Sequence, residues 1–587
     1  MKVNKNIVIL LSIILFFGSC QKYLDVTPDG RISLEDVWKD PKMVEAYLNS
    51  AYSEMEANQG GLRYFTYAFL EGVTDLFHDS DDFEPDALLA PMWYQGALSP
   101  SYDPTQTRDN VNVFRAYWAG IRKCNVFLQN IDQATVVTEG QRLRMKAEAK
   151  VLKSWYYFQL SKKYGPMPIT DEPLSLDTDF EKISRPSSFQ DVADFINKEW
   201  NEIKDIKDLP WRISTDLDKG RMTKAIMLLL RSQAQLFAAS PLYNETHDIE
   251  KWRKAKEYAE EGIQLLSNQG GYALYYDSSL GEESFRNYFL NNRDFSLSPR
   301  DKETILESTS PHAMIWPLLM NGFPQRNLEK AGSCPTQELV DMFDMKETGL
   351  PIVSPLAPYL DSDHLQPNYF AGSGYDINNP YYGRDPRFYA TVIHNGAYIP
   401  GIDEVAQTYV GGASEVRPNG GRRNTRTGYY LSKFLDQNLP EPALLGAYWK
   451  RMRFAEFYLN LAEAENEING PGPAVTAAMK PIRDRAHMPP IPQNISTKEE
   501  MRAYLQKERA VEFALEEQRI WDVRRWKILD KTDKLVTGMK IEKIGGNFRY
   551  ERFVVNRRKS WEDKFLLFPI PLSEISVLGK EWQNPGW

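Results

Sequence analysis

The chain of 587 residues has few of the residues that build metal sites and disulfide scaffolds. Its three cysteines, Cys20, Cys124 and Cys334, form no CxxC pair, and its six histidines are scattered without an HExxH motif. This excludes zinc ribbons and disulfide-stapled folds and leaves no zincin signature. An excess of positive charge is also lacking. The 80 acidic and 71 basic residues give a formal charge of −9, which argues against a nucleic-acid partner bound through a basic surface.

Long hydrophobic runs are missing as well. The run Ile7–Phe17 has eleven residues, whereas a bilayer-spanning helix needs about 20. Two lysines precede the run and two small residues follow it, which is the layout of a secretory signal peptide. Cys20 stands directly after the small pair, as in the lipobox of bacterial lipoproteins. We therefore predict a signal peptide over residues 1–19 and lipidation of Cys20. The alternative is an ordinary signal peptide cleaved near Ser19, with Cys20 incidental.

Amphipathic helices dominate the rest of the pattern. Apolar residues recur at i, i+3, i+4 and i+7 in successive segments, which predicts helices that pack in pairs. Along 252–266, small residues alternate with large ones, as in tetratricopeptide-type repeats, but no strict period of about 34 residues is visible. The predicted helices are 43–55, 114–131, 147–160, 187–203, 222–239, 252–266, 449–467 and 474–486.

Two regions have the composition of loops. Residues 60–110 and 268–445 are rich in glycine, proline, asparagine, aspartate and aromatic residues. We predict long loops and short hairpins there. Irregular segments of this length are uncommon in compact domains unless they are functional, so these regions are expected to carry a binding surface.

A series of short motifs follows in order along nearly the whole chain. Each motif alone is weak, but their number and order resemble the SusD/RagB family of outer-membrane lipoproteins from Bacteroidetes. At His487 the chain departs from the family, which usually has a glycine after the alanine of this turn. The motifs are Ser19–Asp25, Ala147–Phe158, Tyr164–Pro168, Gly220–Asn244, Pro335–Val340, Arg384–Phe388, Thr427–Tyr430, Arg453–Leu459, Glu508–Trp526, Phe568–Pro571 and Asn584–Gly586.

The resemblance implies a mostly α-helical, SusD-like fold over residues 20–587. In that fold, four tetratricopeptide-like helix pairs, at about 41–268 and 445–530, form a scaffold. The loop-rich segments at about 60–110 and 268–445 form an irregular half that carries the ligand site. The implied protein is lipid-anchored at the cell surface, on the outer membrane. It captures oligosaccharides and hands them to a SusC-like TonB-dependent transporter. It is no enzyme and needs no cofactor. The alternatives are a peptide receptor on the same scaffold and a surface glycoside hydrolase.

Aromatic residues in the loops are the first candidates for ligand contacts. Trp93 and Tyr94 lie in one insertion bounded by proline and glycine, and Trp316 with Asn321 lies in another. Tyr102 is a weaker addition. Sugar rings stack their apolar C–H faces on aromatic side chains, and the family often takes such contacts from these insertions. The alternative for Trp93 is burial beneath its loop.

An acidic run over residues 78–86 adds Asp82 as a candidate acceptor for sugar hydroxyls. Oxygen ligands at this spacing are also compatible with Ca²⁺. The run is no EF-hand, because Phe83 stands where an oxygen ligand belongs. A solvated loop with helix-capping aspartates is the simpler interpretation, so we predict no metal site.

Closely spaced charges near the C-terminus have two interpretations. Glu508, Glu512 and Glu516 fall on one helix face, with Arg519 and Arg524 nearby. In a hydrolase, two such carboxylates would serve as acid and base. The SusD/RagB family keeps this pattern as scaffold, so we predict a structural ionic network and no catalytic residue.

Overall fold

The structure is a computed structural model of the whole chain. It describes the following residues: 33–55, 69–80, 82, 89–101, 112–175, 177–179, 182–186, 188–290, 301–308, 322, 324–326, 330–439 and 449–587. No helix within these ranges is both long and apolar enough to cross a membrane.

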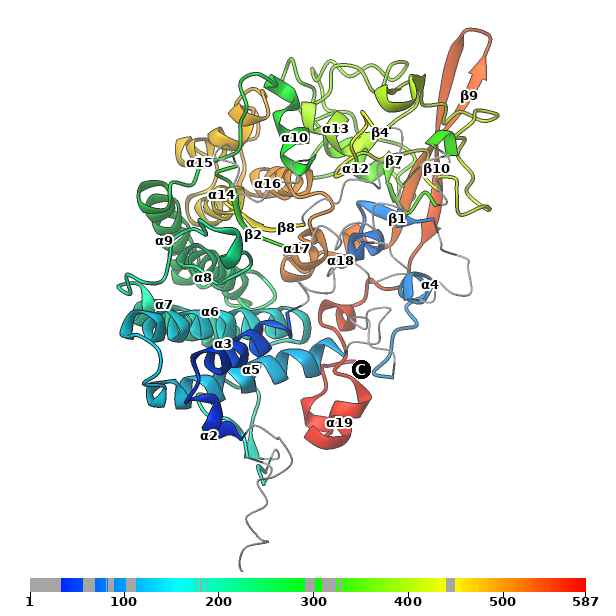
Figure 1. Cartoon of the computed structure of the whole chain (residues 1–587). Helices are drawn as coiled ribbons and strands as arrows, with labels where there is room; N and C mark the ends of the chain where they lie inside the picture. Colours follow the sequence, from blue (N-terminus) through cyan, green and yellow to red (C-terminus); the bar gives the residue numbers. More distant parts are fainter. Residues whose placement is uncertain are drawn as a thin grey trace, which may run out of the picture.

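Helices stacked on one another form one side of the molecule (Figure 1). Neighbours in the stack are mostly consecutive in sequence, but α9 packs directly on α14, which follows it only after the long irregular region. This arrangement confirms the predicted mostly α-helical fold. The helices of the stack are α2 (Leu34–Val37), α3 (Pro41–Tyr52), α5 (Val113–Asn130), α6 (Glu139–Tyr164), α7 (Gln190–Ile203), α8 (Lys224–Ala239), α9 (Ile249–Leu265), α14 (Ala455–Asn469), α15 (Pro473–Arg485) and α16 (Lys498–Glu512).

Local sequence signals set the ends of these helices. Thr138 and Gln141 form a capping box at the start of α6, and Gly165, with a φ of 83°, ends that helix. Thr223 caps α8, which is buried on all sides. Two predicted starts are wrong. The helix expected from residue 147 begins at Glu139. The helix expected from residue 449 begins at Ala455, because the preceding residues form strand β8 (Lys450–Arg453).

The other side of the molecule has short helices and two-stranded antiparallel pairs joined by loops (Figure 1). This matches the loops and hairpins predicted for 268–445. The short helices are α4 (Leu89–Tyr94), α10 (Ser284–Leu290), α12 (Gln337–Met342), α13 (Pro386–Thr391), α17 (Arg519–Arg525), α18 (Leu529–Thr532) and α19 (Leu572–Leu578). The strand pairs are β1 (Phe77–Asp79) with β3 (Ser333–Pro335), β2 (Thr304–Glu307) with β8, β4 (Val392–Ile393) with β7 (Tyr430–Leu431), and β5 (Tyr398–Ile399) with β6 (Glu404–Val405). A longer hairpin of β9 (Leu535–Ile544) and β10 (Asn547–Arg557) extends away from the body (Figure 1).

A buried ionic network joins the two sides. Glu512 on α16 is fully buried and faces Arg387 at 3.2 Å, Arg453 at 2.7 Å and Arg485. These arginines come from α13, β8 and α15, so one carboxylate ties the helix stack to the irregular side. Burial acts to raise the pKa of Glu512, but Arg485 and Arg453 outweigh it and the net shift is downward. A general acid must instead keep its proton near neutral pH. The structural ionic network predicted around Glu512 is therefore confirmed, whereas Arg524 lies outside it and donates to the carbonyl oxygens of Ile520 and Phe565.

Candidate functional site

Trp93 and Tyr94 on α4 are buried, with only 1% and 3% of their surfaces exposed. The Trp93 ring meets Phe568 edge to face, with 5.5 Å between centroids, and the Arg524 guanidinium lies 5.3 Å from it. The expectation that the pair forms an exposed stacking platform is thus corrected. The C-terminal segment that carries Phe568 covers the indole. Burial of Trp93, which is the alternative expectation, is therefore what the structure shows.

Tyr94 is part of a polar cluster with His78 and Asp79, which begin the acidic run. Its hydroxyl donates to the Gly72 carbonyl oxygen at 2.6 Å and accepts from the Asp79 amide at 3.1 Å. Its ring stacks on His78, with centroids 4.6 Å apart. Both ends of the side chain are thus engaged within the protein. Tyr94 therefore positions this cluster and offers no free ring face to a ligand.

Among the predicted contacts that lie in the described ranges, only Asp82 is partly exposed, with 17% of its side-chain surface accessible. Its oxygens contact His78 Nε2 at 3.1 Å and Arg426 Nε at 3.0 Å. Arg558 approaches the other nitrogen of His78, Nδ1, at 3.4 Å. A guanidinium only donates, so Nδ1 accepts and the proton resides on Nε2. Burial acts to raise the pKa of Asp82, but His78 and Arg426 outweigh it and lower the pKa. Asp82 is therefore an ionised acceptor held in a fixed orientation.

The remaining predicted site residues, Cys20, Tyr102, Trp316 and Asn321, lie outside the described residues, as does most of the acidic run. Their predicted roles stay predictions. Within the described ranges, no group of three or more histidine, cysteine, aspartate or glutamate side chains is arranged to hold a metal ion.

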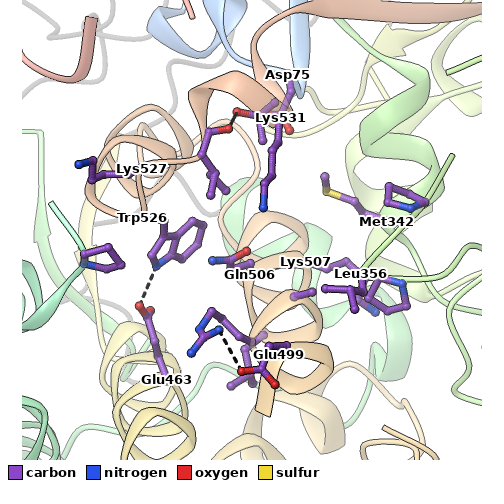
Figure 2. Close-up of a pocket in the computed structure, with 18 of the residues that line it drawn as sticks. Asp75, Met342, Leu356, Glu463, Glu499, Gln506, Lys507, Trp526, Lys527 and Lys531 are labelled. Atoms are coloured by element: carbon purple, nitrogen blue, oxygen red, sulfur yellow. Dashed lines mark hydrogen bonds and ion pairs between the residues drawn. The ribbon is translucent and has the colours of Figure 1, made fainter. Parts of the chain in front are cut away.

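A pocket of about 740 Å³ lies where the helix stack meets the irregular side. Sequence analysis did not predict it. Figure 2 shows its walls, which come from α14 and α16, from Trp526 with α18, and from α12 with residues 353–364. These segments are far apart in the sequence. Several lining residues lie in motifs that resemble the SusD/RagB family, among them Asn244, Glu338 and Trp526, but those motifs did not indicate a pocket.

Both polar and apolar side chains line the pocket. Trp526 donates from Nε1 to Glu463 at 2.7 Å, which fixes the indole against one wall (Figure 2). Met342 and Leu356 lie on the opposite side (Figure 2). Four carboxylates of the lining are each held by an arginine through two hydrogen bonds: Asp75 by Arg519, Asp341 by Arg552, Glu463 by Arg525 and Glu467 by Arg502. Such pairs are rigid, and two of the arginines, Arg502 and Arg519, line the pocket together with the carboxylates.

Two family models match the chain. The SusD family model matches residues 318–587, and a model described as "Starch-binding associating with outer membrane" matches residues 22–206. Two curated relatives, the SusD-like proteins P25 and P38 of Formosa agariphila, are 24% and 23% identical over 30% and 40% of this chain. These alignments span 32% and 43% of the relatives' own lengths. The chain belongs to the SusD/RagB family.

Solved structures share the fold. A SusD-like protein from Bacteroides fragilis is 26% identical, with a TM-score of 0.72 over 94% of this chain and 99% of that one. A SusD-like carbohydrate-binding protein from the same organism is 18% identical, with a TM-score of 0.63 over 92% and 99%. A laminarin-binding SusD-like protein is 22% identical, with a TM-score of 0.55 over 94% and 100%. The mostly α-helical SusD-like fold therefore extends over nearly the whole chain.

Proposed function

We propose that the protein is a non-catalytic glycan receptor that captures oligosaccharides at the cell surface and passes them to a SusC-like TonB-dependent transporter. Membership of the SusD/RagB family is the observation that carries this proposal. Carbohydrate binding by two proteins of the same fold, one of them laminarin-binding, supports a glycan as the ligand.

The pocket of Figure 2 is the described site that suits such a ligand. A sugar hydroxyl both donates and accepts hydrogen bonds, and the walls hold acceptors in the carboxylates and donors in Arg502 and Arg519. At about 740 Å³ the pocket has the size of known ligand sites. Asp82 is proposed as a further contact, together with Trp316, Tyr102 and Asn321 in the predicted loops.

Attachment to the outer membrane is proposed to depend on a lipid on Cys20. The chain has more acidic than basic residues, so its net charge gives no attraction to anionic headgroups. The family description that mentions association with the outer membrane supports this location. The transporter partner is proposed from the family alone.

Binding to an array of oligosaccharides, run beside a pool of peptides, tests the proposal. We expect saturable binding to one class of oligosaccharide, and thin-layer chromatography should recover that ligand uncleaved. Binding to peptides alone would favour the alternative, a peptide receptor on the same scaffold. Cleavage products would indicate a hydrolase.

A further inference from the structure

Many charges around the pocket of Figure 2 are paired, although Asp361, also in the lining, has no cationic partner among the described residues. The four carboxylates described above are each neutralised by an arginine. Lys507, whose side chain is also part of the lining, is bound by Asp344 and lies 3.4 Å from Glu508. Charges paired at these distances contribute little net potential in the pocket.

One cation of the lining lacks such a partner. Lys531 on α18 extends into the hollow, toward the part of the pocket where Gln506 of α16 lies (Figure 2). Among the residues that the structure describes, neither side chain has a hydrogen-bond or ion-pair partner. The ammonium group and the amide therefore present free donors to the same part of the pocket. This is a local positive site in a chain whose formal charge is −9.

We infer that this part of the pocket binds an oxyanion carried by a sugar, either the carboxylate of a uronic acid or a sulfate ester. Lys531 supplies the opposite charge and Gln506 a neutral donor. A charge-assisted hydrogen bond is stronger than a neutral one, so an anionic sugar gains affinity here over its neutral counterpart. The inference rests on the proposed glycan function and adds the class of glycan.

The lining also holds a buried acceptor, which suits a ligand that carries hydrogen-bond donors beside its anionic group. Asn466 on α14 is only 1% exposed, and its Oδ1 atom has no partner among the described residues. It lines the same pocket. A buried acceptor without a partner costs free energy until a donor reaches it, and a sugar hydroxyl is such a donor. Several hydroxyls around one anionic group would engage Asn466 and the paired carboxylates together.

Three variants test the inference by calorimetric titration. Lys531→Met removes the charge and keeps the side-chain length, and Lys531→Arg keeps the charge. Lys527→Met is the matched control, because Lys527 points away from the hollow (Figure 2) and its nearest carboxylate, Glu245, is 3.8 Å away and 79% exposed. The probes are oligosaccharides of galacturonic acid, sulfated galactose and neutral galactose of equal length. Thermal melts confirm that each variant is folded.

We expect the wild-type protein to bind one anionic series at least about tenfold more tightly than the neutral series. Lys531→Met should lose about tenfold in affinity for that series, the size of one charge-assisted hydrogen bond. Lys531→Arg and Lys527→Met should stay within about threefold of the wild-type protein. Raising the salt concentration should weaken anionic binding by the wild-type protein more than by Lys531→Met.

Other results overturn the inference in distinguishable ways. If the neutral series binds as tightly and Lys531→Met changes nothing, the inference fails and the glycan receptor stands. If no anionic sugar binds, the inference fails as well. If a glutamate octapeptide binds in a Lys531-dependent manner and no sugar does, the inference and the proposed function fail together.

Discussion

Trp93 is a structural residue, because Phe568 and Arg524 enclose its indole. Trp93→Ala should lower the free energy of unfolding by about 3–5 kcal/mol, the usual cost of emptying a large core site. Chemical denaturation followed by circular dichroism measures the change. Tyr382→Ala is the control, since that ring is 76% exposed, and it should change stability by less than about 0.5 kcal/mol. Equal stability of the two variants would contradict the placement of Trp93.

Asp533 should make stability depend on pH. Burial, and then the charge of Asp75, raises its pKa to about 6, whereas an unfolded aspartate titrates near 4. The folded chain therefore holds this proton more tightly. The resulting stabilisation is complete below about pH 4 and is lost as the pH rises through about 6.

Asp533→Asn removes this titration. Between pH 4.5 and 7.5 the wild-type protein should lose about 2 kcal/mol more of its unfolding free energy than the variant does, at about 1.4 kcal/mol for each pKa unit. Urea unfolding of both proteins at the two pH values measures the difference. Parallel pH profiles would show that Asp533 titrates normally.

Sequence patterns placed Trp93 in a loop, whereas it lies on the short helix α4, and they did not distinguish exposed from buried side chains. Trp93 is covered by Phe568, which lies far away in the sequence. No local pattern carries that information. Lys531 and Gln506 were missed for the same reason, because their common pocket exists only after distant segments meet.

At the scale of elements, the arginines of the ionic network should contribute strongly to the free energy of unfolding. Arg453 on β8 pairs with Glu303 at 2.7 Å and with Glu516 at 2.6 Å, in addition to Glu512. Arg453→Met would leave these buried carboxylates without a major partner, which typically costs about 3–5 kcal/mol.

A surface pair provides the control for this prediction. Lys480 and Asp484 are both well exposed and lie one turn apart on α15. Lys480→Met should change the free energy of unfolding by no more than about 1 kcal/mol. Urea titrations of both variants give the comparison. A loss for Arg453→Met as small as that for Lys480→Met would contradict a structural role for the network.

The helices were the most predictable elements, because most have an apolar stripe and several have side-chain caps. The strands were much less predictable. Strand β8 pairs with β2 across the irregular region, and local periodicity does not reveal a distant partner. The β9–β10 hairpin was also missed, although Gly545 and Gly546 stand at its turn and paired glycines are a hairpin signal.

At the scale of the whole molecule, the order of the family motifs predicted the fold. The proposed location at the outer membrane is tested through Cys20. Cys20→Ala should abolish labelling by an alkyne palmitate analogue and remove the protein from the outer membrane. Labelling of the variant would contradict lipidation at Cys20.

The wild-type protein, purified in mild detergent, should bring down a larger barrel protein, because a stable complex of this kind buries more than about 2,000 Å².

Whether the protein holds an oligosaccharide without cleaving it is the central question, and one titration addresses it. The mature chain is titrated calorimetrically with the oligosaccharide class found on the array, and the ligand is then recovered and sized by mass spectrometry. The account predicts saturable one-site binding and a ligand of unchanged mass. No heat of binding with any oligosaccharide class, or recovery of shortened ligand, would contradict it.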